Sequence, residues 1–154
     1  MVETPTAEDV LREARARADA DLVLMAAAIS DYRPAEPRGD KRPKGQEAWQ
    51  IELTPTKDVL AELGDRRDNG QVLVGFAADT GKQGLARARE KLERKQLDLV
   101  VFNDVARADI GFDAAENEVV LVTREGERRV ARAPKELIAQ AVLDAVAPLL
   151  EQRL

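Results

Sequence analysis

The sequence predicts an α/β fold, with a Rossmann-like, mainly parallel sheet, flanking helices, and a C-terminal β-hairpin and helix. Two continuous apolar runs of strand length, DLVLMAAA at residues 21–28 and QVLVGFAA at residues 71–78, are typical of parallel strands buried on both faces. A helical segment at about residues 83–95 leads from the second run to a third strand, DLVVFND, at residues 98–104. This strand–helix–strand order predicts a βαβ unit, which is characteristic of α/β folds.

The N-terminal half supplies further helices and a strand. Thr6 and Asp9 form the pattern of a capping box, which predicts a helix that runs to about Ala18. The alternating segment WQIEL, residues 49–53, indicates a strand, and a short helix is expected at residues 56–63. A helix therefore precedes each of the first two buried strands, as an α/β fold requires.

The C-terminal third predicts a hairpin and a final helix. Residues 118–132, EVVLVTREGERRVAR, alternate on both sides of a turn that we expect at Glu125-Gly126. Pro134 favours the first turn of a helix. We expect this helix to direct four apolar side chains inward: Leu137, Ile138, Val142 and Val146. Because no internal repeat or interdomain linker is present, residues 1–154 are expected to form a single domain.

The composition excludes several classes of function. A chain of 154 residues with 44% hydrophobic side chains is long enough for one domain with a real core. Its formal charge of −5 argues against general nucleic-acid binding, and no apolar stretch approaches the ~20 residues that span a bilayer. Because cysteine and histidine are absent, disulfides, thiolate metal sites and histidine acid–base chemistry are excluded, and we predict no metal-binding side chains. Catalysis must use Lys, Arg, Asp, Glu, Asn or the backbone, in a protein that we expect to be cytoplasmic.

A long polar loop at residues 30–47 follows the first buried strand. It begins with Asp31 at the end of the strand, contains three prolines, and carries Lys41, Arg42 and Lys44. Prolines keep a segment out of a helix, and a loop of this length inside a compact domain is usually functional or mobile. We interpret the loop as a flexible basic flap over an anion, with an exposed basic turn as the alternative.

Polar side chains follow all three buried strands. The pairs are Ser30 and Asp31, Asp79 and Thr80, and Asn103 and Asp104. Ligands of open parallel sheets bind outside the carboxyl ends of the strands, so these residues are candidates for a site. Strand ends are polar in most proteins, however, and the pattern alone favours ordinary solvent-exposed ends.

Two further features leave alternatives open. Gly75 interrupts the second buried strand, where a glycine commonly marks the close approach of a ligand or another backbone. Phe76 beside it either stacks on a base or packs in the core. Lys91 and Lys95 share one face of a helix, where they either bind a polyphosphate or form a solvated surface. The residues by themselves predict an α/β domain with an anion site.

Six short motifs of this sequence occur, in the same order, in one known family. AAAISDYRP is similar to the family's AAVADYRP, and Lys41 falls on the first lysine of its K-I-K-K flap motif. TPTKDVL resembles N-P-D-I-L, and GFAADT resembles GFAAET. Lys91, Lys95 and the FND that follows match the K-x-x-x-K and A-N-D segments. Over most of its length the chain thus resembles the C-terminal part of the phosphopantothenoylcysteine synthetases, also called phosphopantothenate–cysteine ligases.

The resemblance implies a ligase of coenzyme A biosynthesis that joins 4′-phosphopantothenate to cysteine. A nucleotide, CTP in most bacteria and ATP in eukaryotic relatives, activates the carboxylate as an acyl-nucleotidylate and releases pyrophosphate. The cysteine amine then displaces the nucleoside monophosphate. Mg²⁺ is expected with the phosphates, with few protein ligands of its own.

The resemblance also implies roles for residues by their position. Ala27 and Asp31 are expected to contact the nucleoside, and Lys41 to act as the catalytic residue that reaches the phosphates and the reacting carboxylate from the flap. The remaining expected nucleotide-binding residues are Lys57, Asp58, Val59, Leu60, Phe76, Lys91 and Lys95. Asn103 and Asp104 fall on a further motif, for which a substrate-binding or structural role is expected.

The sequence also departs from the family. The family's N-terminal glycine-rich segment and its fused phosphopantothenoylcysteine decarboxylase domain have no counterpart here, so we expect the chain to be a fragment that has those parts as partners. Pro43 replaces a lysine of the flap motif. The resemblance implies a homodimer, with residues 118–132 as the candidate interface. The alternative is a non-catalytic nucleotide-binding or regulatory fragment of the same fold. A nicotinamide-dependent reductase is disfavoured because the glycine fingerprint is absent.

Overall fold

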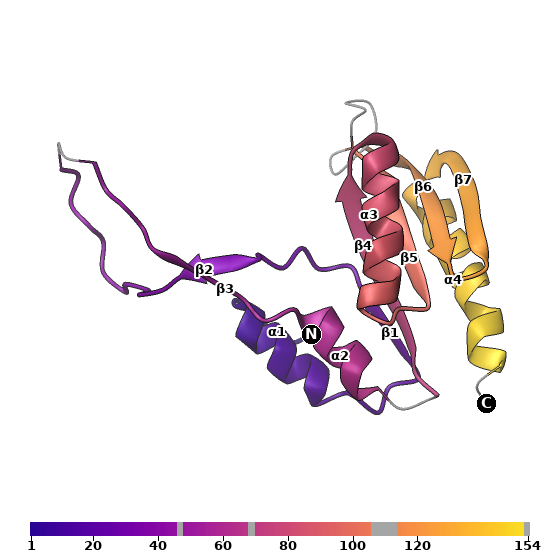
Figure 1. Ribbon diagram of the computed structural model, residues 1–154, viewed down its shortest axis with the longest axis horizontal. Coiled ribbons are helices and arrows are strands. Elements are labelled where there is room, and N and C mark those ends of the chain that lie inside the picture. The colour runs from indigo at the N-terminus through magenta and orange to yellow at the C-terminus, as the bar shows by residue number, and fades with distance from the viewer. Residues whose placement is uncertain (46–47, 68–69, 106–113, 153–154) are drawn as a thin grey trace.

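The computed structural model describes residues 1–45, 48–67, 70–105 and 114–152. Within these segments a five-stranded sheet has the order β1-β4-β5-β6-β7 (Figure 1). Its strands are β1 (Leu22–Met25), β4 (Val72–Asp79), β5 (Leu99–Asp104), β6 (Glu116–Thr123) and β7 (Gly126–Pro134). β1, β4 and β5 are parallel, whereas β6 and β7 form an antiparallel hairpin that extends the sheet from β5. The predicted α/β fold class with its C-terminal hairpin is confirmed.

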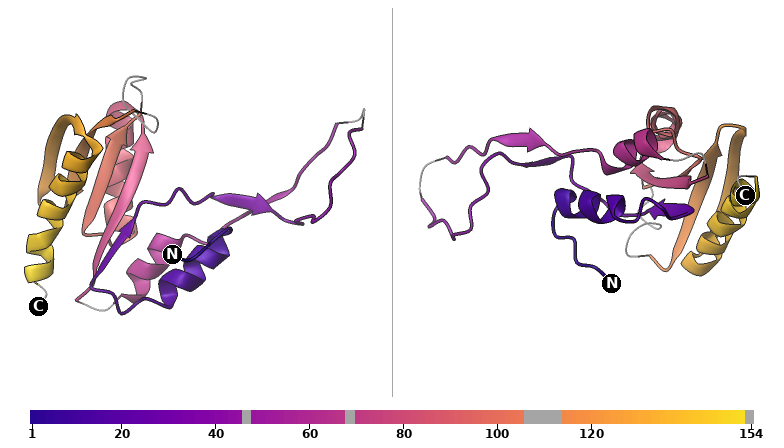
Figure 2. Two further views of the ribbon diagram at one scale, coloured as in Figure 1. Left: turned by 180° about the vertical axis from the view of Figure 1, so that it is seen from behind. Right: turned by 90° about the horizontal axis from the view of Figure 1, so that it is seen from below.

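Helices cover both faces of this sheet (Figures 1 and 2). They are α1 (Ala7–Arg15), α2 (Val59–Arg66), α3 (Gly81–Arg94) and α4 (Lys135–Glu151). One core cluster joins Leu73, Val100 and Phe102 of the strands to α1, α2 and α3. The other joins Val74 and Val101 to α4. Alternate residues of β4 and β5 therefore belong to opposite halves of the core, as expected for strands buried on both faces. No helix in the described segments is long and apolar enough to cross a membrane.

Side-chain caps fix where the first two helices begin. The Thr6 hydroxyl accepts a hydrogen bond from the backbone N–H of Asp9 at 3.1 Å, and the Asp9 carboxylate accepts one from Thr6 N–H at 3.1 Å. The predicted capping box is confirmed, although the helix ends at Arg15 rather than at Ala18. Asp58 caps α2 by accepting a hydrogen bond from Ala61 N–H at 3.1 Å. The short helix expected at residues 56–63 thus begins later and runs to Arg66.

An extended arm leaves the body between β1 and α2. Its two strands, β2 (Tyr32–Pro34) and β3 (Leu53–Pro55), pair with each other in an antiparallel ribbon and, among the described residues, with no strand of the main sheet. The prediction of a strand at residues 49–53 was wrong in position. Trp49 and Ile51 are exposed, and strand pairing starts at Leu53. Figure 1 shows the ribbon and the residues beyond it extending away from the sheet. Residues 46 and 47 of the expected flap lie outside the described segments.

Two details of the C-terminal region differ from the prediction. The hairpin turns at Arg124-Glu125, one residue earlier than expected, because Thr123 pairs with Gly126. Gly126 has a φ of +151°, which favours glycine at that position. Leu137 is 60% exposed and does not point inward, whereas Ile138, Val142 and Val146, also of α4, are buried against the sheet. Neighbouring helix positions are separated by about 100°, and here Ile138 lies on the buried face of α4 while Leu137 lies off it.

Candidate functional site

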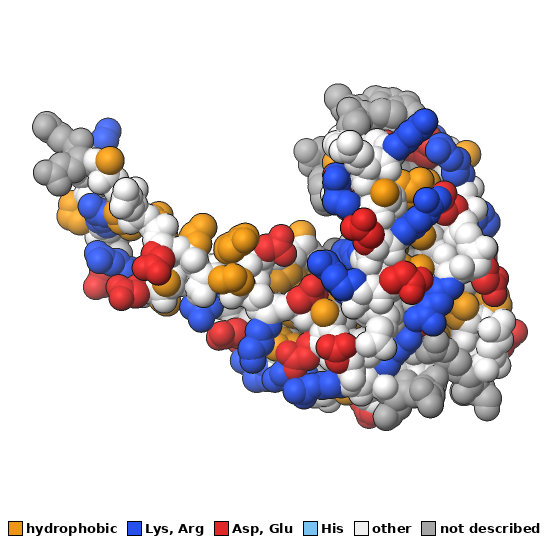
Figure 3. Space-filling model, in the orientation of Figure 1, with side chains coloured by type: hydrophobic (Ala, Val, Ile, Leu, Met, Phe, Trp, Pro, Cys, Tyr) orange, Lys and Arg blue, Asp and Glu red, His pale blue; other side chains and the backbone are white. Residues whose placement is uncertain are grey.

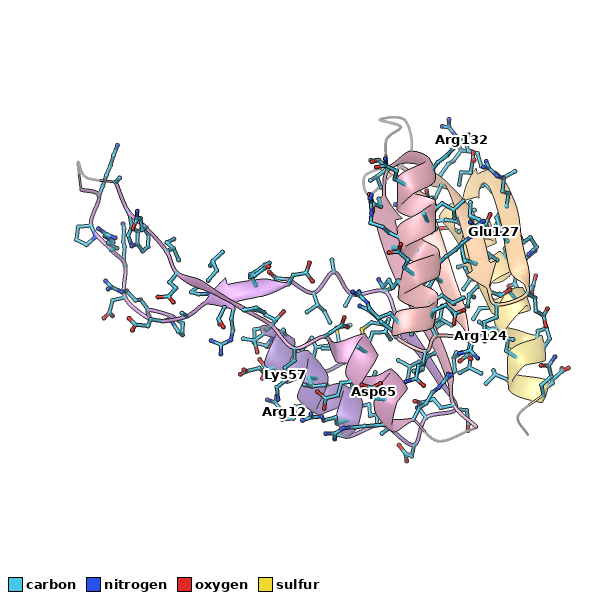
Figure 4. The ribbon with its side chains drawn as sticks, viewed as in Figure 1. Arg12, Lys57, Asp65, Arg124, Glu127 and Arg132 are labelled. Carbon is cyan, nitrogen blue, oxygen red and sulfur yellow. The ribbon has the colours of Figure 1, made fainter. Side chains whose placement is uncertain are left out.

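A cavity of about 150 Å³ lies at the carboxyl end of β1, between the base of the arm, the start of α2 and the last turns of α3. Its lining consists of Met25, Ala27, Ile29, Ser30, Asp31, Thr56, Lys57, Asp58, Val59, Leu60, Phe76, Lys91 and Lys95. Nine of the ten residues expected to bind a nucleotide are among them, and Lys41 is the exception. The structure therefore brings together residues from four separate sequence segments. Figure 4 shows Lys57 at the start of α2.

Asp58 and Lys95 form a charged wall of this cavity. Lys95 Nζ lies 2.7 Å and 2.9 Å from the two carboxylate oxygens of Asp58. Burial, which alone would raise the pKa of Asp58, is outweighed by hydrogen bonds from Lys95 and from Ala61 N–H, so the pKa is lowered. The same carboxylate thus caps α2 and holds the Lys95 ammonium at the edge of the cavity.

Lys91 lies one turn before Lys95 on α3. Its Nζ donates a hydrogen bond to the carbonyl oxygen of Phe76 at 2.7 Å. Burial lowers the pKa of Lys91 and the charge of Lys95 lowers it further, whereas Asp58 and Asp31 oppose the shift. A half-buried ammonium in this state is stabilised by an added negative charge. The cavity is therefore electrostatically suited to an anion.

The base of the arm contributes Ser30, Asp31 and Thr56 to the lining of the cavity. Thr56 N–H donates to the carbonyl oxygen of Asp31 at 2.9 Å, and the Thr56 hydroxyl donates to that of Ser30 at 2.5 Å. The Ser30 hydroxyl donates to the carbonyl oxygen of Tyr32 at 2.7 Å. Ser30 was a candidate only as a polar residue at a strand end, and Thr56 was not predicted to bind a ligand, although both lie inside the motifs AAAISDYRP and TPTKDVL. These hydrogen bonds fix the backbone that presents Asp31 to the cavity.

The structure decides what approaches Gly75 and where Phe76 packs. A Cβ on Gly75 would lie 2.8 Å from Leu60 Cδ2 and 2.9 Å from Leu97 Cδ1, so the glycine makes room for two core side chains. Phe76 packs against the core cluster beneath α4, on the face of the sheet away from α3. Its carbonyl oxygen is the group that holds Lys91. Core packing, the second of the two alternatives for Phe76, is the one observed.

Lys41 is exposed on the arm and does not line the cavity. Its neighbour Arg42 stacks over the ring of Trp49, with 4.3 Å between the guanidinium carbon and the ring centroid. This contact joins the two sides of the arm, and contacts of this kind are attractive. In this arrangement the arm carries its basic residues away from the site that they were expected to cover (Figure 3).

Asn103 and Asp104 lie at the end of β5, away from the cavity. Asp104 Oδ1 accepts a hydrogen bond from Gly81 N–H at 3.1 Å, which satisfies a free donor at the start of α3. It lines a different cavity of about 210 Å³ with Lys82 and Arg129. The side-chain oxygen of Asn103 is buried and has no hydrogen-bond partner among the described residues. The structure thus gives Asp104 a structural role.

The cavity fits part of a nucleotide. Among the described residues, no three His, Cys, Asp or Glu side chains are placed to hold a metal ion. A volume of about 150 Å³ is below the ~300–1,000 Å³ of pockets for drug-sized ligands, so it admits a base or a sugar but not a whole nucleoside triphosphate. The polar groups of the lining nevertheless suit such a ligand, because Asp31 can accept hydrogen bonds from sugar hydroxyls and Lys91 and Lys95 can donate to phosphate oxygens.

Fold and cavity together define a Rossmann-like α/β domain with a cation-lined pocket at the carboxyl end of its parallel strands. The family model described as "DNA/pantothenate metabolism flavoprotein C-terminal domain" matches residues 1–150, and the chain belongs to this family. The family membership inferred from the six motifs is confirmed.

Individual relatives extend this result. The coenzyme A biosynthesis bifunctional protein CoaBC of Mycolicibacterium smegmatis is 37% identical over 145 residues, which cover 88% of this chain and 35% of that protein. A protein named cysteine/cysteine sulfinic acid decarboxylase, from an unknown prokaryotic organism, is 34% identical over 106 residues, which cover 69% of this chain and 29% of that protein. The crystal structure of the C-terminal domain of CoaBC matches with a TM-score of 0.77 at 28% identity, covering 98% of this chain and 66% of that one. The chain spans about a third of the length of the curated relatives it matches.

Proposed function

We propose that this chain is the nucleotide-binding part of a ligase that joins 4′-phosphopantothenate to cysteine in coenzyme A biosynthesis, with CTP as the activating nucleotide. One observation carries the proposal: nine residues that match the family's nucleotide site by position line a single cavity. The relative from Mycolicibacterium smegmatis is named for coenzyme A biosynthesis, which supports the pathway.

In the proposed reaction, a carboxylate oxygen of 4′-phosphopantothenate attacks the α-phosphorus of CTP. The α–β phosphoanhydride bond breaks and pyrophosphate leaves. The cysteine amine then attacks the acyl carbon, the carbon–oxygen bond to CMP breaks, and the nitrogen loses a proton to solvent. Lys91 and Lys95 would counter the negative charge that grows on the phosphate oxygens, and Mg²⁺ would accompany the phosphates.

Lys41 is proposed to be a mobile cation of this reaction. Because it lies on the arm and outside the cavity, it can contribute only if the arm bends toward the cavity or if a second chain supplies it. Either route brings a positive charge to the phosphates after binding, which is a known function of mobile flaps. Lys41→Ala should therefore reduce turnover more than it reduces the affinity of the chain for the nucleoside monophosphate.

A homodimer is part of the proposal, and two surfaces are candidates for its interface. The hairpin places β7 at the edge of the sheet, where Arg132 and Glu127 are among its charged residues (Figure 4). The arm instead exposes apolar side chains, since Tyr32, Trp49 and Leu53 are each more than half exposed. Light scattering on Trp49→Ser and Arg132→Ala distinguishes the two surfaces, because only the variant at the true interface should shift the mass toward the monomer.

Calorimetric titration with CTP and then with ATP, in the presence of Mg²⁺, tests the nucleotide site. We expect saturable CTP binding that Lys91→Met weakens. Pyrophosphate release on addition of 4′-phosphopantothenate, cysteine and the N-terminal part of the ligase then tests turnover. Binding without pyrophosphate release would favour a non-catalytic nucleotide-binding fragment, and absence of binding to either nucleotide would refute the assigned site.

A further inference from the structure

A groove of about 290 Å³ runs along α3 beside the carboxyl half of β4. Residues 76–79 of β4 form one wall, and Arg87, Lys91 and Arg94 of α3 lie along the other. In the described segments, β1 pairs with β4 only as far as Met25 and Gly75, so the carboxyl half of β4 has no strand partner on that side. The groove therefore follows a strand edge that a ligand can approach.

The charge of the groove is strongly positive for a chain with a net charge of −5. Arg87, Lys91 and Arg94 are spaced by four and three residues, so they share one face of α3. Asp79 is the carboxylate in the lining, and it is already engaged: Arg87 Nε and Nη2 donate to it at 2.6 Å and 2.5 Å. Hydrogen bonds from Arg87 lower the pKa of Asp79, which keeps it ionised and paired.

Arg94 has no such partner. Its side chain makes no hydrogen bond or ion pair with any described residue and is exposed beside the groove. Figure 3 shows Lys and Arg side chains spread over α3 on the visible face of the molecule. With Arg87 and Asp79 compensating each other, Lys91 and Arg94 give the groove lining a net positive charge, which Asp58 and Asp31 of the adjoining cavity offset in part.

The groove adjoins the cavity described above. Phe76 and Lys91 line both, so a ligand that fills the cavity can continue into the groove past the Lys91 ammonium. This continuity matters because the cavity, at about 150 Å³, is too small to enclose a whole nucleoside triphosphate.

We propose that the groove is a second anion subsite, which binds the phosphoryl groups of a pyrophosphate or a phosphomonoester beside the nucleoside cavity. Arg94 contacts the phosphate oxygens directly, Lys91 lies between the two sites, and Arg87 offers Nη1 while its other nitrogens hold Asp79. Charge-assisted hydrogen bonds of this kind are the strong ones in phosphate recognition. The source of the ligand rests on the proposed function: it is either the outer phosphates of CTP or the phosphate of 4′-phosphopantothenate.

The test is calorimetric titration of the full chain at low ionic strength with pyrophosphate, inorganic phosphate, 4′-phosphopantothenate, CMP and CTP. Arg94→Gln removes a charge that has no structural partner, so the variant should fold normally. Arg89→Gln is the matched control, because Arg89 lies on the same helix but pairs with Glu127 of the hairpin at 2.5 Å. We expect Arg94→Gln to lower the affinity for pyrophosphate and for CTP by about tenfold and to leave the affinity for CMP unchanged. Arg89→Gln should match the wild type, and Arg94→Lys should recover most of the affinity.

Each outcome separates this subsite from the proposed function. Equal pyrophosphate affinity in wild type and Arg94→Gln overturns the subsite even if CTP binds. Pyrophosphate binding that depends on Arg94 in a chain that binds neither CTP nor CMP supports the subsite and overturns the proposed function. A loss of affinity for pyrophosphate, inorganic phosphate and 4′-phosphopantothenate, with CTP affinity unchanged, assigns the groove to the phosphate of the acid substrate.

Discussion

Replacement of Asp58 tests whether one side chain both starts α2 and positions Lys95. Asp58→Asn keeps an oxygen that can cap the helix but removes the charge that faces Lys95, whereas Asp58→Ala removes both. Asp58 is 44% exposed, so its ion pair is worth only about 0.5–1 kcal/mol. Loss of an N-cap costs about 1 kcal/mol. We expect Asp58→Asn to lower the free energy of unfolding by about 0.5–1 kcal/mol and Asp58→Ala by about 1.5–2 kcal/mol.

The pH dependence gives a second measurement on the same residue. Because the folded state lowers the pKa of Asp58, its contribution to stability is present at neutral pH and is lost as the pH falls through that lowered pKa. Urea denaturation followed by circular dichroism should therefore show the wild type and Asp58→Asn converging in acid. Equal stabilities at neutral pH, or a difference that persists in acid, would refute the ion-pair argument. An Asp58→Asn variant as unstable as Asp58→Ala would show that Asn cannot cap this helix.

Three further predictions concern the core and the buried charges. Gly75→Ala places a Cβ within 2.9 Å of two buried leucine side chains, so it should cost about 1–3 kcal/mol in urea denaturation; Gly39→Ala, which meets nothing within 4 Å, is the control. Asp98→Ala leaves the 13% exposed Arg67 without its partner at 2.5 Å and should cost about 3–5 kcal/mol; a loss near zero would count against a structural role for that pair. The folded state lowers the pKa of Lys91, so the free energy of unfolding of the wild type, relative to that of Lys91→Met, should rise as the pH increases through the titration of this lysine. A difference that does not depend on pH would contradict the burial argument.

The resemblance to the family predicted most of the lining of the cavity, because that lining lies in the short motifs that the chain shares with the family. Residues 57–60 surround the N-cap of α2, and a capping residue followed by apolar residues is a pattern that local sequence specifies. Lys91 and Lys95 share a face because the helix period is fixed. Thr56 was missed, and Ser30 was named only as a polar strand end, because the two residues are joined by a hydrogen bond between segments 26 residues apart, which no local pattern specifies.

The direction of the arm and the packing of Phe76 could not be predicted for different reasons. Prolines and charges indicate that residues 30–47 are extended, but the ribbon that aims the arm forms between β2 and β3, far apart in the sequence. The two-residue period of a strand places Phe76 on the same face as Val72 and Val74. This period does not tell which of the two faces of the sheet borders the cavity, since helices bury both faces.

The hydrogen bonds at the base of the arm, which we call its neck, have a consequence for regulation. Thr56 joins the end of the ribbon to Ser30 and Asp31, and all three residues also line the cavity. A ligand that prefers one geometry of this neck must therefore favour one orientation of the arm. By thermodynamic reciprocity, any macromolecule that fixes the arm changes the affinity of the cavity by the same factor as the ligand changes the affinity for that macromolecule. Binding at a distant part of the arm would thus depend, through the neck, on whether the cavity is filled.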